Sequence, residues 1–161
     1  MDQTTVKILH GIGEINEEDW DKCAHGIQPY NPFLTHKFLL ALENSQSVSP
    51  KTGWQPFHLQ VERGKELIGV VPMYLKNHSQ GEYVFDYGWA DAWQRAGGSY
   101  YPKLQCSVPF TPATGPRLLA QSPTEENSQI LLNAAIEVAE QTKVSSMHMT
   151  FMSKVQWEHA G

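Results

Sequence analysis

Cysteines, basic residues and long apolar runs are all scarce in this sequence. The two cysteines, Cys23 and Cys106, are too few for a disulfide framework, and their scarcity indicates a reducing compartment. No run approaches the roughly 18 apolar residues that a membrane-spanning helix requires. The N-terminus also lacks the basic and apolar regions of a signal peptide. We therefore expect a cytoplasmic protein without a membrane span.

The 161 residues include 12 Lys and Arg against 17 Asp and Glu, so the formal net charge is −5. Binding to a nucleic-acid backbone requires a basic surface, and we therefore expect no DNA partner. One stretch differs from the rest. Between Ala92 and Thr124 there is no acidic residue, while Arg95, Lys103 and Arg117 are present. This stretch suits a small anion, or it is a loop-rich segment that happens to lack acids.

Hydrophobic residues make up 40% of the chain and aromatic residues 11%, which is enough for a packed core and too much for disorder. The length fits a single domain over residues 1–161, or part of a longer protein. Expected strands cover residues 6–10, 55–63, 67–75, 83–87, 104–108 and 147–152, with an extended run at 117–119. Expected helices cover 17–25, 36–44, 89–95 and 125–143.

Three residues are expected to cap these helices, namely Asn16, Thr35 and Thr124. Pro72 interrupts the expected strand 67–75, which implies a sheet edge or a bulge at that point. Helices among mixed strands predict an α+β (α/β layered) domain, with a mixed, mostly antiparallel sheet flanked by helices. The last expected strand needs a partner late in the chain, so the domain is expected to be incomplete at its C-terminus. A second half, domain swapping or a homodimer would complete it.

The segment 78–86 concentrates chemically active side chains. If residues 82–86 are extended, Glu82 and Asp86 share one face but lie about 13 Å apart, too far for a carboxylate pair. Either one then acts as a lone general base, with His78 orienting it, or both make surface or capping hydrogen bonds. Seven histidines are scattered without i, i+4 spacing, and neither cysteine has a partner at ligand spacing, so we expect no metal site.

Aromatic residues flank the next candidate. Tyr100, Tyr101 and Lys103 form a segment that fits a sugar or a phosphate, or else packs over the core with the lysine reaching water. Trp89 and Trp93 are four residues apart and are expected to pack on one face of a short helix. The proline-rich loop 109–117 either lines a site or forms a fixed crossover between strands.

Several of these blocks resemble the FemAB-like family, whose members are described as peptidoglycan biosynthesis or recognition proteins and as predicted N-acyltransferases. The blocks are NPFLTH (31–36), GVVPMYLK (69–76), HSQGEYVFD (78–86), WADA (89–92), YYPKL (100–104) and VPFTPATGPRLL (108–119). They are long and specific, and the resemblance covers roughly residues 28–152.

The resemblance implies an acyl-CoA N-acyltransferase-like (GNAT-like) fold and transfer of an acyl or aminoacyl group to an amine, with a peptidoglycan precursor as acceptor. Family members carry two such domains in tandem, and this chain resembles the N-terminal one. In related murein-peptide transferases the donor is an aminoacyl-tRNA, held largely by the second domain. The CoA-binding loop Q/R-x-x-G-x-G/A has its nearest match at Arg95–Tyr100, with Tyr in place of the last Gly or Ala. We therefore expect no cofactor in this chain, and the donor stays open between acyl-CoA and aminoacyl-tRNA.

Residue type and motif position then suggest roles. Lys103 and Arg117 are expected to bind anionic groups of the acceptor, and Glu82 or Asp86 is the expected base. The supporting residues in this scheme are His78, Tyr83, Tyr101 and Thr111. Two rivals remain: a CoA-dependent small-molecule acetyltransferase working as a dimer, and a non-enzymatic module that recognises a cell-wall precursor or another protein.

Overall fold

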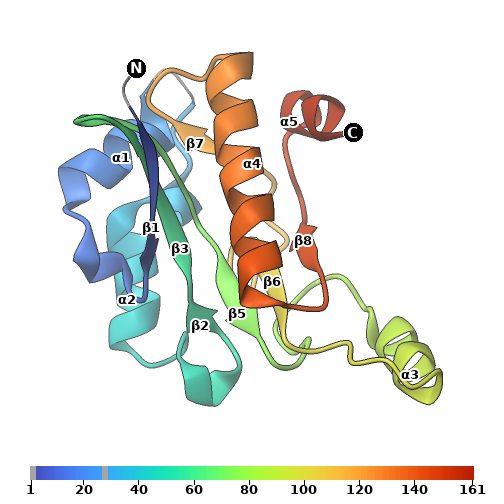
Figure 1. Ribbon diagram of the computed structural model, residues 1–161. Coiled ribbons are helices and arrows are strands. Elements are labelled where there is room, and N and C mark those ends of the chain that lie inside the picture. Colours follow the sequence, from blue (N-terminus) through green and yellow to red (C-terminus); the bar gives the residue numbers. More distant parts are fainter. Residues whose placement is uncertain (1–2, 27–28) are drawn as a thin grey trace.

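The computed structural model describes residues 3–26 and 29–161, and within them the fold is α+β (Figure 1). One four-stranded sheet has the order β1-β3-β4-β7, and a second has the order β2-β5-β6-β8. The strands are β1 (Thr4–Leu9), β2 (Gln55–Pro56), β3 (His58–Arg63), β4 (Glu66–Val71), β5 (Tyr74–Lys76), β6 (Lys103–Cys106), β7 (Leu119–Ala120) and β8 (Met147–Met149). The α-helices are α1 (Glu17–His25), α2 (His36–Asn44), α3 (Tyr87–Arg95), α4 (Glu125–Thr142) and α5 (Lys154–Ala160).

The helix starts are confirmed where a capping residue predicted them. The side chains of Asn16, Thr35 and Thr124 each accept a hydrogen bond from a backbone N–H in the first turn of α1, α2 and α4. The buried residues of α4 are Leu131, Ala134, Ala135 and Val138, which share one face of the helix. No helix in the described part of the chain is long and apolar enough to cross a membrane.

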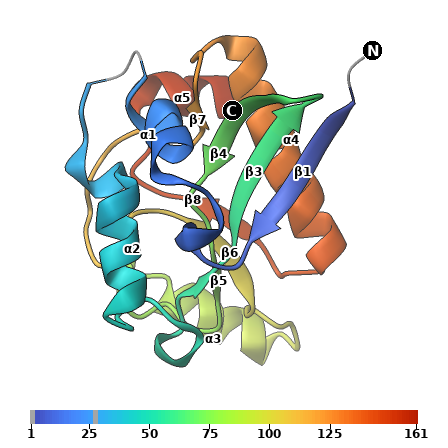
Figure 2. The same cartoon turned by 90° about the vertical axis from the view of Figure 1, so that its left-hand side faces the viewer.

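The first sheet forms the centre of the molecule. Helix α4 covers one face of β3 and β4, while α1 and α2 lie on the other side (Figure 2). Leu59 and Val61 of β3 are fully buried in the cluster that α4 covers, and Trp20 of α1 is buried on the opposite side. Burying each such side chain contributes about 1.5–3 kcal/mol, so these two layers hold the scaffold rigid.

The chain passes from the first sheet to the second between β4 and β5. The expected strand 67–75 is therefore two strands, and the break falls at Pro72, which has no N–H to donate to a ladder. The expected strand 55–63 also divides, at Phe57, whose N–H donates to the carbonyl of Met73 at 2.9 Å. The buried His58 accepts a hydrogen bond from the Met73 N–H at 3.1 Å. These bonds fix the position of β5, which carries part of the site described below.

Every strand pair in the two sheets is antiparallel except β6 with β8, which is parallel. This agrees with the expectation of mixed, mostly antiparallel strands, although they lie in two sheets where one was expected. The last strand, expected over 147–152, is β8 and has three residues. Helix α5, which follows β8, was not predicted.

The expected strand at 83–87 is wrong. Residues 83 and 84 form bends, residues 85 and 86 have no regular structure, and helix α3 begins at Tyr87 and projects from the body of the molecule (Figure 1). The expected packing of the two tryptophans is also wrong, because Trp89 is 76% exposed and Trp93 is 56% exposed. Ala90 is the buried residue of this nine-residue helix. In the segment before α3, Asp86 is buried, while Tyr83, Val84 and Phe85 are exposed.

Candidate functional site

Two lysines lie directly opposite each other in the second sheet. Lys76 of β5 pairs in register with Lys103 of β6, and both side chains are 0% exposed. Residues directly opposite in an antiparallel pair project from the same face, where two positive charges destabilise the sheet unless anions offset them. The polar face of this sheet therefore requires negative partners.

Glu82 and Asp86 supply those partners. Lys103 Nζ donates to Glu82 Oε2 at 2.8 Å and to Asp86 Oδ2 at 2.6 Å, and Glu82 Oε1 lies 3.8 Å from Lys76 Nζ. Both carboxylates are almost fully buried. The expectation that an extended segment holds them about 13 Å apart is wrong, because a turn at 80–81 and bends at 83–84 bring both carboxylates onto one ammonium group. The result is a buried cluster of two lysines and two carboxyl groups.

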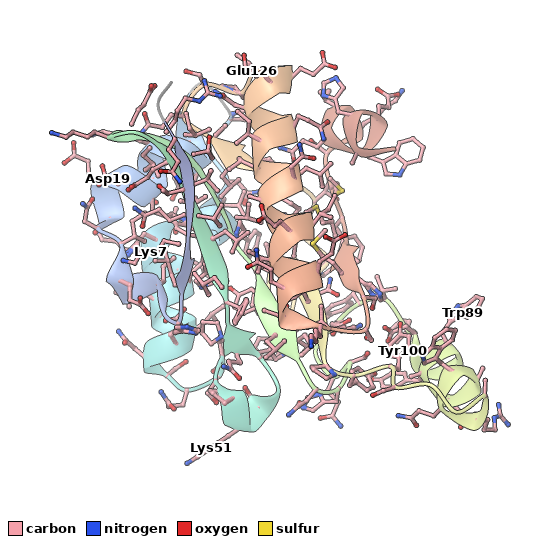
Figure 3. The ribbon with its side chains drawn as sticks, in the orientation of Figure 1. Lys7, Asp19, Lys51, Trp89, Tyr100 and Glu126 are labelled. Atoms are coloured by element: carbon pink, nitrogen blue, oxygen red, sulfur yellow. The ribbon has the colours of Figure 1, made fainter. Side chains whose placement is uncertain are left out.

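Aromatic and polar side chains surround the cluster. Tyr100 donates its hydroxyl to Asp86 Oδ2 at 2.8 Å, and Tyr101 shares a 2.6 Å hydrogen bond with Ser79. Lys76 Nζ donates to the carbonyl of Gln80 at 3.1 Å and lies 3.5 Å above the centre of the Trp54 indole. Helix α3 and the segments on either side of it form a projecting arm, residues 82–102. Figure 3 shows Tyr100 at the base of this arm and Trp89 at its outer surface. The cluster thus joins the arm to the sheet.

The environment separates the acidities of the two carboxylates. Burial raises the pKa of Glu82 above its ordinary value, and the hydrogen bond from Lys103 only partly offsets this. Burial also acts to raise the pKa of Asp86, but hydrogen bonds from Lys103, Ser79 and Tyr100 outweigh it, and its pKa is lowered. Burial lowers the pKa of Lys76 to about 7, against the attraction of Glu82. Opposed shifts in neighbouring carboxylates are typical of an acid–base site.

Four buried polar atoms around this face have no hydrogen-bond partner among the described residues. They are Glu82 Oε1, Asp86 Oδ1, Gln105 Oε1 and Ser107 Oγ. Gln105 follows Lys103 on the same strand face, and its amide nitrogen donates to Thr150 at 2.9 Å. An unpartnered buried polar atom costs about 1–3 kcal/mol. The face therefore holds more hydrogen-bonding capacity than the described part of the chain uses.

The structure brings Glu82, Asp86, Lys103 and Tyr101 together, and it leaves the other expected site residues outside this hydrogen-bonded group. His78 is half-buried and accepts from the Gln80 N–H at 3.2 Å, and burial and the charge of Lys76 lower its pKa. His78 lines a shallow groove together with Lys51, Thr52 and Phe110. Tyr83 points outward and is half exposed. Thr111 lies in the loop between β6 and β7.

Arg117 is fully buried and contacts backbone carbonyls. Its Nε donates to Thr150 at 2.9 Å, and its Nη2 donates to Ala113 at 2.6 Å. Its Nη1 donates to Pro116 at 3.2 Å, and burial lowers its pKa to about 10. These bonds fasten the proline-rich loop to the segment after β8. Anion binding by Arg117 remains a prediction that this geometry does not favour.

Sequence reasoning missed Lys76, Trp54 and Gln105. A lysine at the end of an otherwise apolar strand is a weak signal, because such residues usually reach solvent. The alternation of Lys103 and Gln105 along β6 places both on one face and was the stronger signal.

Within the described ranges, no group of three or more His, Cys, Asp or Glu side chains is arranged to hold a metal ion. Burial raises the pKa of both Cys23 and Cys106 to about 12, so their thiols stay protonated at neutral pH.

Comparison with known proteins gives one result. The model of the FemAB-like family, described as peptidoglycan biosynthesis/recognition, matches residues 11–161. A search among curated proteins found no match.

Proposed function

Because the chain belongs to the FemAB-like family of peptidoglycan biosynthesis and recognition, we propose that it takes part in N-acyl transfer to an amine of a peptidoglycan precursor. The proposal includes the GNAT-like fold that the resemblance implied and assigns this chain to the N-terminal half of a two-domain arrangement. The α+β order of elements supports it. The observation that carries it is the joining of Glu82 and Asp86 by the one ammonium of Lys103.

In such a transfer the amine nitrogen attacks the acyl carbon, a new C–N bond forms, and the bond from that carbon to the donor breaks. The amine must lose one proton, and the leaving group must leave with the bonding electrons. Glu82 is the proposed acceptor of that proton, since burial raises its pKa towards the range of an effective general base. In this structure Asp86 and Glu82 both pair with Lys103, and hydrogen bonds lower the pKa of Asp86, so Asp86 is the less suitable base of the two.

The donor is proposed to bind outside this cluster, in a second domain or in the partner of a homodimer. Arg95 is the last residue of α3, and the segment after it leads into β6 rather than into a helix. A CoA pyrophosphate site of the usual kind needs backbone N–H groups that open a helix. This placement favours an aminoacyl-tRNA donor over acyl-CoA, but both belong in the test.

The test is a transfer assay with a UDP-linked murein precursor as acceptor and either acetyl-CoA or aminoacyl-tRNA as donor. We expect Glu82→Gln to lower kcat by about 10²–10⁴, as loss of a general base does. Glu66→Gln, at an exposed position of β4, is the matched control and should retain full activity. Equal rates for Glu82→Gln and the wild type would contradict the proposed base.

A recognition module without turnover is the second candidate, and the exposed aromatic surface of α3 favours it. In that case the wild type binds the precursor, releases no transfer product with either donor, and retains its affinity after Glu82→Gln. Detection of any acylated product that depends on Glu82 would exclude it.

A further inference from the structure

The polar face of the second sheet presents two ammonium groups to a single carboxylate. Glu82 Oε2 accepts from Lys103 at 2.8 Å, while Glu82 Oε1 lies 3.8 Å from Lys76 without a hydrogen bond. One oxyanion therefore sits between two cations that face each other across neighbouring strands. This is the arrangement expected of a site for a phosphate or carboxylate group.

Few backbone hydrogen bonds attach residues 77–86, the segment that carries this carboxylate, to the rest of the molecule. Residues 77–86 form no strand pairing. The carbonyl of Gln80 accepts from Trp54 Nε1 at 3.0 Å and from Lys76 Nζ at 3.1 Å, and the carbonyl of Gly81 accepts from the Phe110 N–H at 3.2 Å. Its outer residues, Tyr83, Val84 and Phe85, are exposed. Its charged connections to the sheet are the two carboxylates, and Ser79 adds a 2.6 Å hydrogen bond with Tyr101. Replacing the two carboxylates by another anion would therefore weaken the attachment of the segment to the sheet.

The sheet face that carries Lys103 also has polar atoms to which residues 77–86 make no hydrogen bond. Gln105 Oε1 and Ser107 Oγ are buried, lie two and four residues beyond Lys103 along the chain, and have no partner in the described ranges. Gln105 Oε1 can only accept, so it calls for a ligand with an N–H or O–H group. A ligand with an oxyanion next to a hydrogen-bond donor would satisfy the lysines and this amide together.

We propose that Lys76 and Lys103 form a binding site for an oxyanion of the acceptor, and that Glu82 and Asp86 occupy this site in the closed structure until the ligand displaces them. The inference rests on the proposed function for the identity of the ligand as an acceptor, but the site itself is testable without transfer. Displacement frees Glu82 from Lys103 when the acceptor is bound, which makes the carboxylate available as the base. A phosphate, with nearly two charges and several acceptor oxygens, matches the two lysines most closely.

The test measures binding of inorganic pyrophosphate and, separately, of N-acetyl-alanyl-alanine to the full chain by calorimetry. The two arms distinguish a phosphate from a carboxylate source. Removing a competing carboxylate raises the fraction of chains with an open site and so tightens apparent binding. We expect Glu82→Gln to lower the Kd of at least one probe by about tenfold, and Lys76→Met to raise it by about tenfold. Lys65→Met, at the exposed β3–β4 turn, is the control and should leave the Kd unchanged.

Hydrogen exchange on the wild-type chain gives a second readout that does not depend on how the variants fold. Exchange of amides in residues 79–86 should accelerate when the probe binds, while amides of β3 and β4 remain protected. The inference is overturned by an unchanged Kd in Glu82→Gln or in Lys76→Met. It is equally overturned by unchanged exchange in 79–86, or by the absence of binding to both the wild type and Glu82→Gln. Oxyanion binding without any transfer, when the donor-binding domain or partner is present, would contradict the proposed function alone. Transfer without oxyanion binding would contradict this inference alone.

Discussion

The ammonium group of Lys76 lies against the indole of Trp54, with 3.5 Å between Nζ and the ring centre. A cation over the face of Trp gains an attraction that partly replaces lost water, worth about 2 kcal/mol when desolvated. Gln80 supplies one hydrogen-bond acceptor, and Glu82 lies 3.8 Å away. These contacts do not restore full hydration, and burial lowers the pKa of Lys76 to about 7.

The first prediction concerns this pKa. Between pH 7 and the ordinary lysine value of 10.5, the unfolded chain holds a proton on Lys76 that the folded chain does not. The free energy of unfolding should therefore rise with pH from about 7 to about 8.5, before thiols and phenols of the unfolded chain ionise, by at most about 1.4 kcal/mol per pH unit. Urea unfolding at several pH values measures the slope. Lys76→Met should remove this rise, whereas Lys65→Met should keep it; the same slope in all three proteins would contradict the assignment.

The second prediction compares the two carboxylates. The lowered pKa of Asp86 means that its ionised form stabilises the fold above its ordinary pKa of 3.8, and that this stability is lost as the pH falls. The raised pKa of Glu82 has the opposite sign, because its contribution is complete below 4.5 and is lost as the pH rises through the folded value. At pH 7, Asp86→Asn should therefore cost about 3 kcal/mol, and Glu82→Gln less than about 1 kcal/mol.

Thermal unfolding measures this difference. At about 2–4 °C per kcal/mol for a chain of this size, Asp86→Asn should lower Tm by roughly 6–12 °C. Asp91→Asn removes an exposed carboxylate that pairs with Arg95 on α3 and should shift Tm very little. A larger loss for Glu82→Gln than for Asp86→Asn would reverse the order and refute the argument.

Local features of the fold could be predicted from the sequence, since they depend on neighbouring residues. Asn16, Thr35 and Thr124 cap helices through bonds within one turn, so each start was visible in the sequence. The division of the strands into two sheets could not be predicted from the sequence. It depends on pairings such as Phe57 with Met73, which bring together residues far apart in the chain.

The candidate site shows the same limit. The β-branched and aromatic residues at 83–87 favour a strand, but Lys103, which follows much later in the chain, holds Glu82 and Asp86 in a turn. Both carboxylates and this lysine were identified by residue type, while their contact was not. Lys76 was missed because its burial depends on Trp54 and Gln80, which come from other segments.

The third prediction concerns Arg117, whose guanidinium donates to three backbone carbonyls. Arg117→Met leaves three partly buried carbonyls without this donor and should lower the free energy of unfolding by about 3 kcal/mol. Arg117→Lys should not restore it, since an ammonium cannot reproduce the planar fork of a guanidinium. Urea unfolding tests both, with Arg63→Met as a control because Arg63 pairs with Glu126 at a partly exposed position. If Arg117→Met keeps wild-type stability but loses oxyanion binding, Arg117 belongs to the site after all.

The fourth prediction concerns the aromatic surface of α3. A nine-residue helix is marginal alone in water, and the Trp89 and Trp93 side chains of this one face solvent. Replacing both by Ser should change the free energy of unfolding by less than about 0.5 kcal/mol per site, because exposed side chains contribute little to the fold. The same double variant should lose binding to the murein precursor if the arm is a recognition surface, whereas oxyanion binding at Lys76 and Lys103 should persist. A large loss of stability would instead show that the two tryptophans pack against the body, which their exposure in this structure contradicts.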